Sequence, residues 1–194
     1  MDTKSQDHRA GPSWDQLYET AAAQAGHFTT VQAEAAGYSP QLLAKYLANG
    51  RVARVRRCVY RLTHFPAGEL EEFAVVWLWS ERAGVFSHET ALFLHGLSDA
   101  LPARMHVTLP ADWRRRRLRV PDGVATHFGE VAGADRGWVG PVPVTAVART
   151  LVDCAQAGVA PEMVRDAMEQ AIERGMIRKG SLPEVAGYLS RFTS

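Results

Sequence analysis

Three short amphipathic segments followed by two β-prone runs constrain the fold of the first third of this chain more than any other feature. Apolar residues recur at helical spacing over residues 14–25, a second short helix is expected over 31–36, and a third begins at Ser39-Pro40. Alternation over 52–62 then predicts a hairpin of two short strands. Helix, helix, tight turn, helix, hairpin is the order of elements in a winged helix-turn-helix.

Residues that begin and end helices delimit these three segments. Side chains that accept an amide hydrogen bond precede each helix, and glycines, which adopt the left-handed turn of a helix end, follow each one. The N-cap candidates are Ser13, Thr29 or Thr30, and Ser39, and the terminating residues are Gly26, Gly37 and Asn49-Gly50. The helix boundaries can therefore be predicted from local chemistry alone.

Beyond the hairpin the chain predicts a second domain. Residues 1–12 are polar and are interpreted as a disordered tail, 13–64 form the winged helix-turn-helix, and Pro66-Ala67-Gly68 marks the boundary to a domain spanning 68–194. Helices are expected over 69–81, 88–95, 145–157, 161–174 and 181–192, and strands over 105–110 and 124–128. The predicted fold class is α+β and helix-rich, with a mixed α/β C-terminal domain.

Composition places the chain among globular proteins. It has 194 residues, of which 46% are hydrophobic and 22% charged, close to the average for soluble domains. No apolar stretch has the length of a membrane helix, and the first residues lack the apolar segment of a signal peptide. Two cysteines, Cys58 and Cys154, form neither a metal cluster nor a disulfide framework. A cytoplasmic location without membrane contact is expected.

Positive charge is concentrated near the N-terminus. Residues 1–64 contain eight Lys/Arg and five Asp/Glu, whereas 65–194 contain fourteen and sixteen, so the net charge of +1 conceals an uneven distribution. The run from Lys45 to Arg61 holds six basic residues and no acidic one. Such a run is the electrostatic footprint expected of a surface that contacts nucleic-acid phosphates.

The solvent face of the third predicted helix carries the candidate base contacts. Gln41, Ala44, Lys45 and Ala48 share this face, and Ser39 stands at its N-terminal end. Glutamine pairs with adenine, and lysine with guanine or a phosphate. We therefore expect Ser39, Gln41 and Lys45 to contact DNA in the major groove. A solvated helix face without a ligand is the alternative interpretation.

Arginines of the predicted hairpin are the candidate phosphate contacts. Alternation places Arg54 and Arg56 on one face of a strand, and Arg51, Arg57 and Arg61 complete the group. Arginines along a wing hold the DNA backbone and make binding salt-dependent. The alternative is an exposed, self-repelling basic surface.

A second basic segment lies in the loop 113–119. It contains Arg114, Arg115, Arg116 and Arg117 in succession. The loop can clamp DNA, bind another negatively charged partner, or protect the edge of a hairpin from mispairing. These alternatives remain open at the level of sequence.

Signatures of catalysis are missing from the sequence. His88 and His95 can share one helical face, but the chain has no His-Glu-x-x-His motif and no Cys/His cluster. It also lacks the phosphate-binding glycine loop, the Gly-x-Ser-x-Gly elbow, and an acidic residue placed before Glu-x-Lys or Gln-x-Lys as in restriction-type nucleases. The prediction is a protein that is not an enzyme, with no catalytic residue, metal ligand or cofactor.

Five blocks of the chain, in order, resemble AbiEi-type antitoxins. The first block precedes the predicted hairpin, the second lies within it, and the other three fall in the second domain. They are 26–37 (GHFTTVQAEAAG), with Leu42, Leu43 and Gly50 after it, 55–62 (VRRCVYRL), 85–97 (VFSHETALFLHGL), 106–110 (HVTLP) and 142–153 (VPVTAVARTLVD). The resemblance extends roughly from Trp14 to Ile177, and Cys58 stands where the family usually has glycine.

This resemblance implies a winged-helix transcriptional autorepressor and antitoxin. Members of the family bind double-stranded DNA at inverted repeats in their own promoter. They belong to type IV toxin-antitoxin or phage-defence (abortive-infection) systems and oppose a nucleotidyltransferase-like toxin, without a need for direct contact. The second domain supports the antitoxin activity.

Two other function classes remain as alternatives. One is a protein-interaction module, for which the apolar Trp77 and Trp79 are the best feature. The other is a nucleic-acid-processing enzyme that uses the arginine loop as a clamp, for which the nearby carboxylates are Asp112, Asp122 and Asp135.

Overall fold

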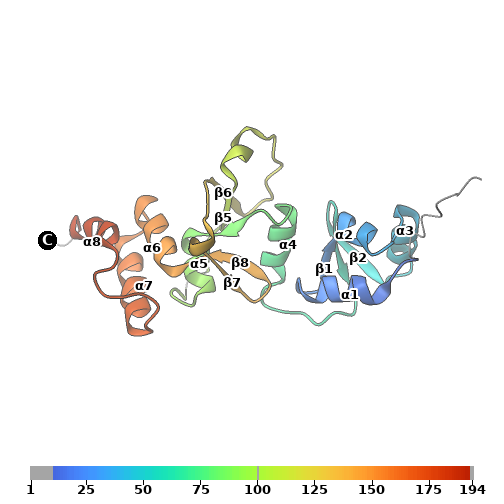
Figure 1. Ribbon diagram of the computed structural model, residues 1–194, viewed down its shortest axis with the longest axis horizontal. Helices are drawn as coiled ribbons and strands as arrows, with labels where there is room; N and C mark the ends of the chain where they lie inside the picture. The colour runs from blue at the N-terminus through green and yellow to red at the C-terminus, as the bar shows by residue number, and fades with distance from the viewer. Residues whose placement is uncertain (1–10, 100, 193–194) are drawn as a thin grey trace, which may run out of the picture. The chain divides into compact units, whose positions relative to one another are not determined.

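The computed structural model of the protein describes residues 11–99 and 101–192 (Figure 1). Most of the predicted disordered tail therefore lies outside the described residues, and its last two residues, Gly11 and Pro12, have no regular secondary structure. The chain divides into two compact units, one ending at Trp79 and the other beginning at Ser80.

The first unit has the elements of a winged helix-turn-helix followed by one more helix. Its three strands form one antiparallel sheet in the order β1-β3-β2. The elements are α1 (Trp14–Ala22), β1 (His27–Thr29), α2 (Thr30–Ala35), α3 (Pro40–Ala48), β2 (Val52–Arg56), β3 (Val59–Leu62) and α4 (Glu71–Trp79). The predicted order of three helices and a hairpin is confirmed, and β1 is an addition that the sequence analysis missed.

Local capping explains where these helices begin. The Oγ of Ser13 accepts a hydrogen bond from the amide of Gln16 at 3.2 Å, and Ser39 accepts one from Leu42 at 3.2 Å. Thr29 rather than Thr30 caps α2, and it forms a reciprocal capping box with Gln32.

The end of the first helix differs from the prediction. Helix α1 ends at Ala22 instead of Ala25, because the chain turns through two left-handed residues, Ala25 (φ 53°) and Gly26 (φ 82°). A side chain added at Gly26 would lie 2.5 Å from the ring of Phe65. This close approach is why the turn requires glycine.

The core of the first unit lies between the helices and the sheet. Leu17 of α1, Phe28 of β1 and Leu43 of α3 are all 4% exposed or less. The ring of Phe28 stacks on Tyr60 of β3 with 5.7 Å between centroids. The short strand β1 therefore contributes the largest fully buried side chain of this unit.

Helix α4 packs against strands β1 and β3 and so belongs to the first unit. The sequence-based boundary at Pro66-Ala67-Gly68 placed this helix in the second domain instead. An ion pair between Arg61 of β3 and Glu71 of α4, with 2.8 Å between Nη2 and Oε1, joins the helix to the sheet. Six of its residues are buried, which accounts for its apolar character on all faces.

The second unit combines a mixed five-stranded sheet with helices. The strand order is β6-β5-β4-β8-β7, with β5 parallel to β6 and β4 parallel to β8. Its elements are β4 (Val85–Phe86), α5 (His88–Leu94), β5 (Met105–Leu109), η1 (Ala111–Arg115), β6 (Val124–Phe128), η2 (Gly133–Asp135), β7 (Arg136–Val139), β8 (Val142–Thr145), α6 (Val147–Gln156), α7 (Pro161–Glu173) and α8 (Pro183–Ser190), where η denotes a 3-10 helix. Strands β4, β7 and β8 were not predicted.

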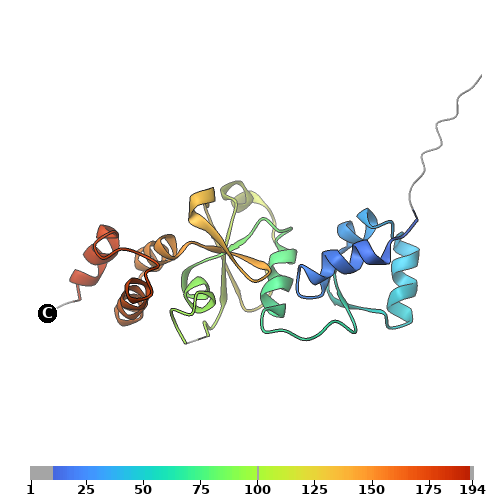
Figure 2. The ribbon, with the colours of Figure 1, turned by 60° about the horizontal axis from the view of Figure 1, so that its bottom comes forward.

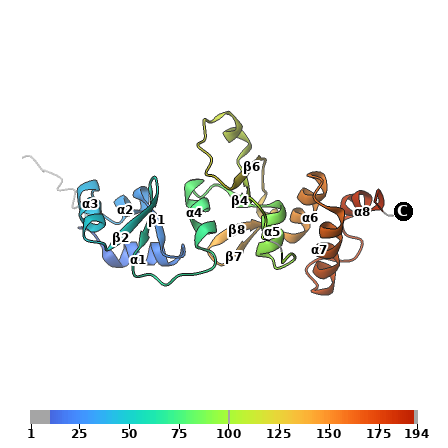
Figure 3. The same cartoon turned by 180° about the vertical axis from the view of Figure 1, so that it is seen from behind.

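Helices of the second unit share a separate apolar core. Figure 2 shows α6, α7 and α8, coloured orange to red, gathered together. Leu92 of α5, Leu151 of α6 and Val164 of α7 are fully buried in this core. Helix α5 also contacts β5 and β8 of the sheet, and Figure 3 shows it beside β8. The predicted helix-rich α+β class is confirmed.

No helix within the described segments combines the length and the apolar character that crossing a bilayer requires.

Candidate nucleic-acid interface

Helix α3 presents the predicted recognition stripe to solvent. Gln41, Ala44, Lys45 and Ala48 are all exposed, whereas Leu43 on the opposite face is only 4% exposed. The stripe follows the helical repeat, so all four side chains point the same way. The structure therefore leaves the candidate base-reading face uncovered within this unit.

Ser39 differs from the other predicted contacts of this helix. Its hydroxyl caps the amide of Leu42, and Pro40 follows it as the first helical residue. Ser39 therefore fixes where α3 begins, and its direct contact with DNA stays a prediction.

Aromatic side chains hold α3 in place. The ring of Tyr46 lies 5.3 Å from Tyr38, edge to face, and 5.9 Å from Trp14 of α1. Burial and a hydrogen bond with Tyr46 raise the pKa of Tyr38 to about 12, so this hydroxyl stays protonated. The guanidinium of Arg51 lies over the ring of Tyr46, 5.3 Å from its centroid.

The hairpin β2–β3 forms an exposed wing. Residues 53–57 are all exposed, and Cys58 completes the turn with φ 62°. This left-handed conformation favours glycine, which agrees with the glycine that the resemblance implies at this position. The pairing register shifts between Arg54 and Arg56, so the strict alternation that placed both arginines on one face is interrupted at Val55.

Arg61 differs from the other wing arginines because its side chain is bonded within the first unit. Its guanidinium donates to the carbonyl of Phe65 at 2.8 Å and to Glu71 at 2.8 Å, and its side chain is 19% exposed. The ion pair also lowers the pKa of Glu71. Arg61 thus joins β3 to α4, and we do not assign it to a phosphate.

Replacing Arg61 by alanine is expected to lower the free energy of unfolding by about 1–3 kcal/mol, because Glu71 and the Phe65 carbonyl lose a charged donor. Urea unfolding measures this loss. Arg54→Ala is the matched control, and its exposed side chain predicts a change within about 0.5 kcal/mol. An unchanged stability together with a reduced salt dependence of DNA binding would instead place Arg61 on a phosphate.

The arginine loop belongs to the second unit, where Arg114 and Arg115 lie in η1 and Arg116 and Arg117 follow it. The guanidinium of Arg116 lies 4.0 Å from the ring centroid of the buried Trp113 and 3.7 Å from Glu81. Arg114 lies 5.8 Å from the ring centroid of Phe128. All four arginines are exposed, and two of them, Arg114 and Arg116, lie over aromatic rings.

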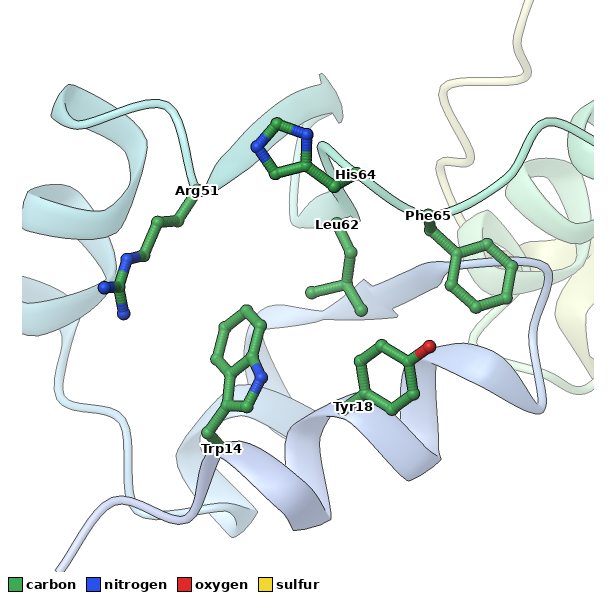
Figure 4. A pocket seen from close by; sticks show the side chains of 6 residues that line it. All are labelled: Trp14, Tyr18, Arg51, Leu62, His64 and Phe65. Atoms are coloured by element: carbon green, nitrogen blue, oxygen red, sulfur yellow. The ribbon is translucent and has the colours of Figure 1, made fainter.

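A pocket of about 270 Å³ opens beside α1 in the first unit. Figure 4 shows Trp14 and Tyr18 rising from α1 around Leu62, with Arg51, His64 and Phe65 completing the wall. Aromatic and aliphatic carbon dominates this lining. A phosphate site needs several N–H donors, so we do not include the pocket in the nucleic-acid surface.

The structure also shows where the residues named for the two alternative functions lie. Trp77 is 8% exposed and Trp79 is half-buried, so neither forms an exposed apolar patch. Asp135 lies 3.4 Å from Arg149. Among the described residues, the side chains close enough together to hold a metal ion are three histidines and not the carboxylates considered from the sequence.

Comparison with known proteins gives a matching family and matching solved structures. The family described as "Transcriptional regulator, AbiEi antitoxin" matches residues 15–63. The crystal structure of the RV2827C protein from Mycobacterium tuberculosis aligns with 15% identity and a TM-score of 0.43, over 96% of this chain and 84% of that chain. None of the curated proteins compared is significantly similar. Residues 15–63, which make up nearly all of the winged helix-turn-helix, thus match the AbiEi family of antitoxin transcriptional regulators, and the resemblance identified from the sequence is confirmed over this segment.

Proposed function

We propose that the protein is a DNA-binding transcriptional autorepressor and antitoxin, and that it is not an enzyme. The observation that carries this proposal is the exposed stripe of α3 followed directly by an exposed arginine wing. In a winged helix-turn-helix, a recognition helix enters the major groove while a neighbouring element lies along the backbone. The regulator family matched by residues 15–63 supports the same role.

Base reading is assigned to the stripe on α3. The amide of Gln41 can pair with N6 and N7 of adenine, and Lys45 can donate to guanine or to a phosphate. The methyl groups of Ala44 and Ala48 are small enough to let the helix approach the groove closely and to contact thymine methyl groups. Ser39 maintains the start of the helix through its cap.

Backbone binding is assigned to the arginines around the wing. Arg54, Arg56 and Arg57 are exposed on the hairpin, and Arg51 precedes it. Each phosphate that such a side chain neutralises releases counterions and adds about 0.9 to the slope of log affinity against log salt. The loop 114–117 is kept as a second, independent candidate for contact with DNA or with another polyanion.

Repression follows if the protein covers its own promoter. The proposed operator contains inverted repeats, because a two-fold repeat places one copy of the protein on each half-site. As an antitoxin, the protein opposes a nucleotidyltransferase-like toxin, and repression of the shared operon achieves this without contact between the two. The proposal places it in the cytoplasm.

A fluorescence anisotropy titration tests the proposal directly. The protein's own upstream promoter and a scrambled duplex are titrated across a series of salt concentrations. We expect promoter binding to be at least about 1000-fold tighter than binding to the scrambled duplex. Gln41→Ala should cost about 1–3 kcal/mol on the promoter and almost nothing on the scrambled duplex. Equal affinity for both duplexes would contradict the repressor assignment.

A further inference from the structure

Three histidines from three separate elements converge in the second unit. His88 is the first residue of α5, His106 lies on β5 and His127 on β6. Thr108 is paired with His127 in the parallel β5–β6 register, and it shares a strand face with His106 two residues earlier. Both strand histidines therefore project from one face of the sheet. One nitrogen of each histidine lies within 4.8 Å of those of the other two.

Hydrogen bonds fix the outer nitrogens of these rings. The Nε2 of His106 lies 3.2 Å from Oε2 of Glu89, while its Nδ1 faces the Nε2 of His127 at 3.0 Å. The Nδ1 of His88 lies 2.9 Å from the Oγ of Ser87. This is the arrangement of metal-binding histidines, in which the second ring nitrogen is held by a carboxylate or another polar group.

Burial disfavours the charged form of all three rings. It lowers the pKa of His106 and of His127, and it lowers that of His88 to about 3. A neutral imidazole offers one nitrogen lone pair to a cation. His106 and Glu89 have side chains that are 19% and 32% exposed, so the cluster is open to solvent on that side.

Two features at the start of α5 are unfavourable for the local backbone but place the ring of His88 in the cluster. His88 has φ 53°, a left-handed conformation that is uncommon outside glycine. Ser87 occupies the N-cap of α5 but makes no capping bond, because its hydroxyl instead contacts His88 and accepts a bond from Thr108 at 2.8 Å. Both features are energetically unfavourable, and both place the His88 ring beside the other two.

We propose that His88, His106 and His127 bind one Zn²⁺ ion, with water in the fourth position. The ligand atoms are Nε2 of His88, Nδ1 of His106 and Nε2 of His127, since the other nitrogens of His88 and His106 already have partners. Three neutral imidazoles with an open position form a donor set that suits Zn²⁺, with metal–nitrogen distances of about 2.0–2.1 Å. The ion would join the start of α5 to β5 and β6 and so stabilise the second unit.

Binding requires the rotation of one histidine ring and a change in the tautomer of His127. The rings of His88 and His127 are now stacked, with 3.7 Å between centroids and 17° between planes, so their in-plane lone pairs run side by side. Rotation about the broad Cβ–Cγ torsion of one ring turns its nitrogen toward the ion. Because Nε2 of His106 faces Glu89, a neutral His106 carries its proton there, and the proton between the two rings belongs to Nε2 of His127. On binding, that proton moves to Nδ1 of His127, so that both rings remain neutral.

Helical spacing in the sequence places His88 and His95 on one face, and no metal ligand was predicted from it. The structure separates these two residues, because Nε2 of His95 lies 2.8 Å from the carbonyl oxygen of Thr145. His106 and His127 lie on different strands at unrelated spacing, and only the pairing of β5 with β6 brings them together.

Titration of the metal-free protein with Zn²⁺ in competition with a chromophoric chelator tests the proposal. We expect one equivalent per chain and an increase of the thermal transition, because the ion binds the folded state. Co²⁺ should give the visible d–d absorption of a site with four or five ligands. Less than stoichiometric Zn²⁺ binding together with no such Co²⁺ spectrum would overturn the proposal.

Variants of the cluster supply the controls. His127→Gln should abolish stoichiometric binding, and Glu89→Gln should weaken it by about 10- to 100-fold through the outer nitrogen of His106. His95→Gln removes a histidine of the same unit outside the cluster and should bind one equivalent like the wild type. Circular dichroism of each metal-free variant establishes that it is folded. Wild-type affinity in a folded His127→Gln protein would contradict the assignment.

Discussion

Replacing Arg56 and Arg57 together by glutamate is expected to weaken binding to the promoter by roughly 100-fold or more and to flatten its salt dependence. Both side chains are exposed at the wing, one at the end of β2 and one in the turn. Each lost phosphate contact should reduce the slope of log affinity against log salt by about 0.9. Anisotropy titration at several salt concentrations measures both quantities.

A matched charge reversal elsewhere separates a local contact from a change in net charge. Arg178 and Lys179 are also adjacent and exposed, in the connection between α7 and α8 of the second unit. Arg178→Glu with Lys179→Glu changes the net charge by the same amount, and it should leave the salt slope close to that of the wild type. Equal losses in the two double variants would show that long-range charge, and not the wing, governs binding.

Phe28→Ala is expected to have the largest effect on stability, a loss of about 3–5 kcal/mol in the free energy of unfolding. The side chain is 0% exposed and stacks on Tyr60 at 5.7 Å, so its removal leaves a cavity beneath the sheet. It also lies directly before Thr29, which caps α2. Urea unfolding of the full chain measures the loss.

The control for this variant is an aromatic truncation at the surface of the same unit. Tyr18 of α1 is 45% exposed, and Tyr18→Ala should cost about 1 kcal/mol or less. A loss below about 1 kcal/mol for Phe28→Ala would mean that the sheet collapses onto the vacated space, as some core sites do.

Local signals in the sequence predicted the winged helix well. Ser13, Ser39 and Gly37 act through hydrogen bonds and backbone angles of their immediate neighbours, so their roles can be seen without a fold. Strand β1 was missed because three residues are too few to show alternation. The two-residue strand β4 was missed for the same reason.

Long-range pairing accounts for what the sequence did not reveal about the sites. Arg61 belongs to the basic run by sequence, and only the packing of α4 on the sheet explains its pairing with Glu71. The histidine cluster likewise depends on the register of β5 against β6. Exposure of Gln41 and Lys45, in contrast, follows from the helical repeat and was predicted.

The left-handed turn at the tip of the wing also gives the protein a natural attachment point for a probe. Of the two cysteines, Cys58 is exposed, whereas Cys154 is buried and its thiol pKa is raised by that burial. A maleimide fluorophore should therefore label the folded chain at Cys58 alone. Such a dye would sit beside Arg57, where its emission would respond directly to an approaching duplex, without any engineered residue.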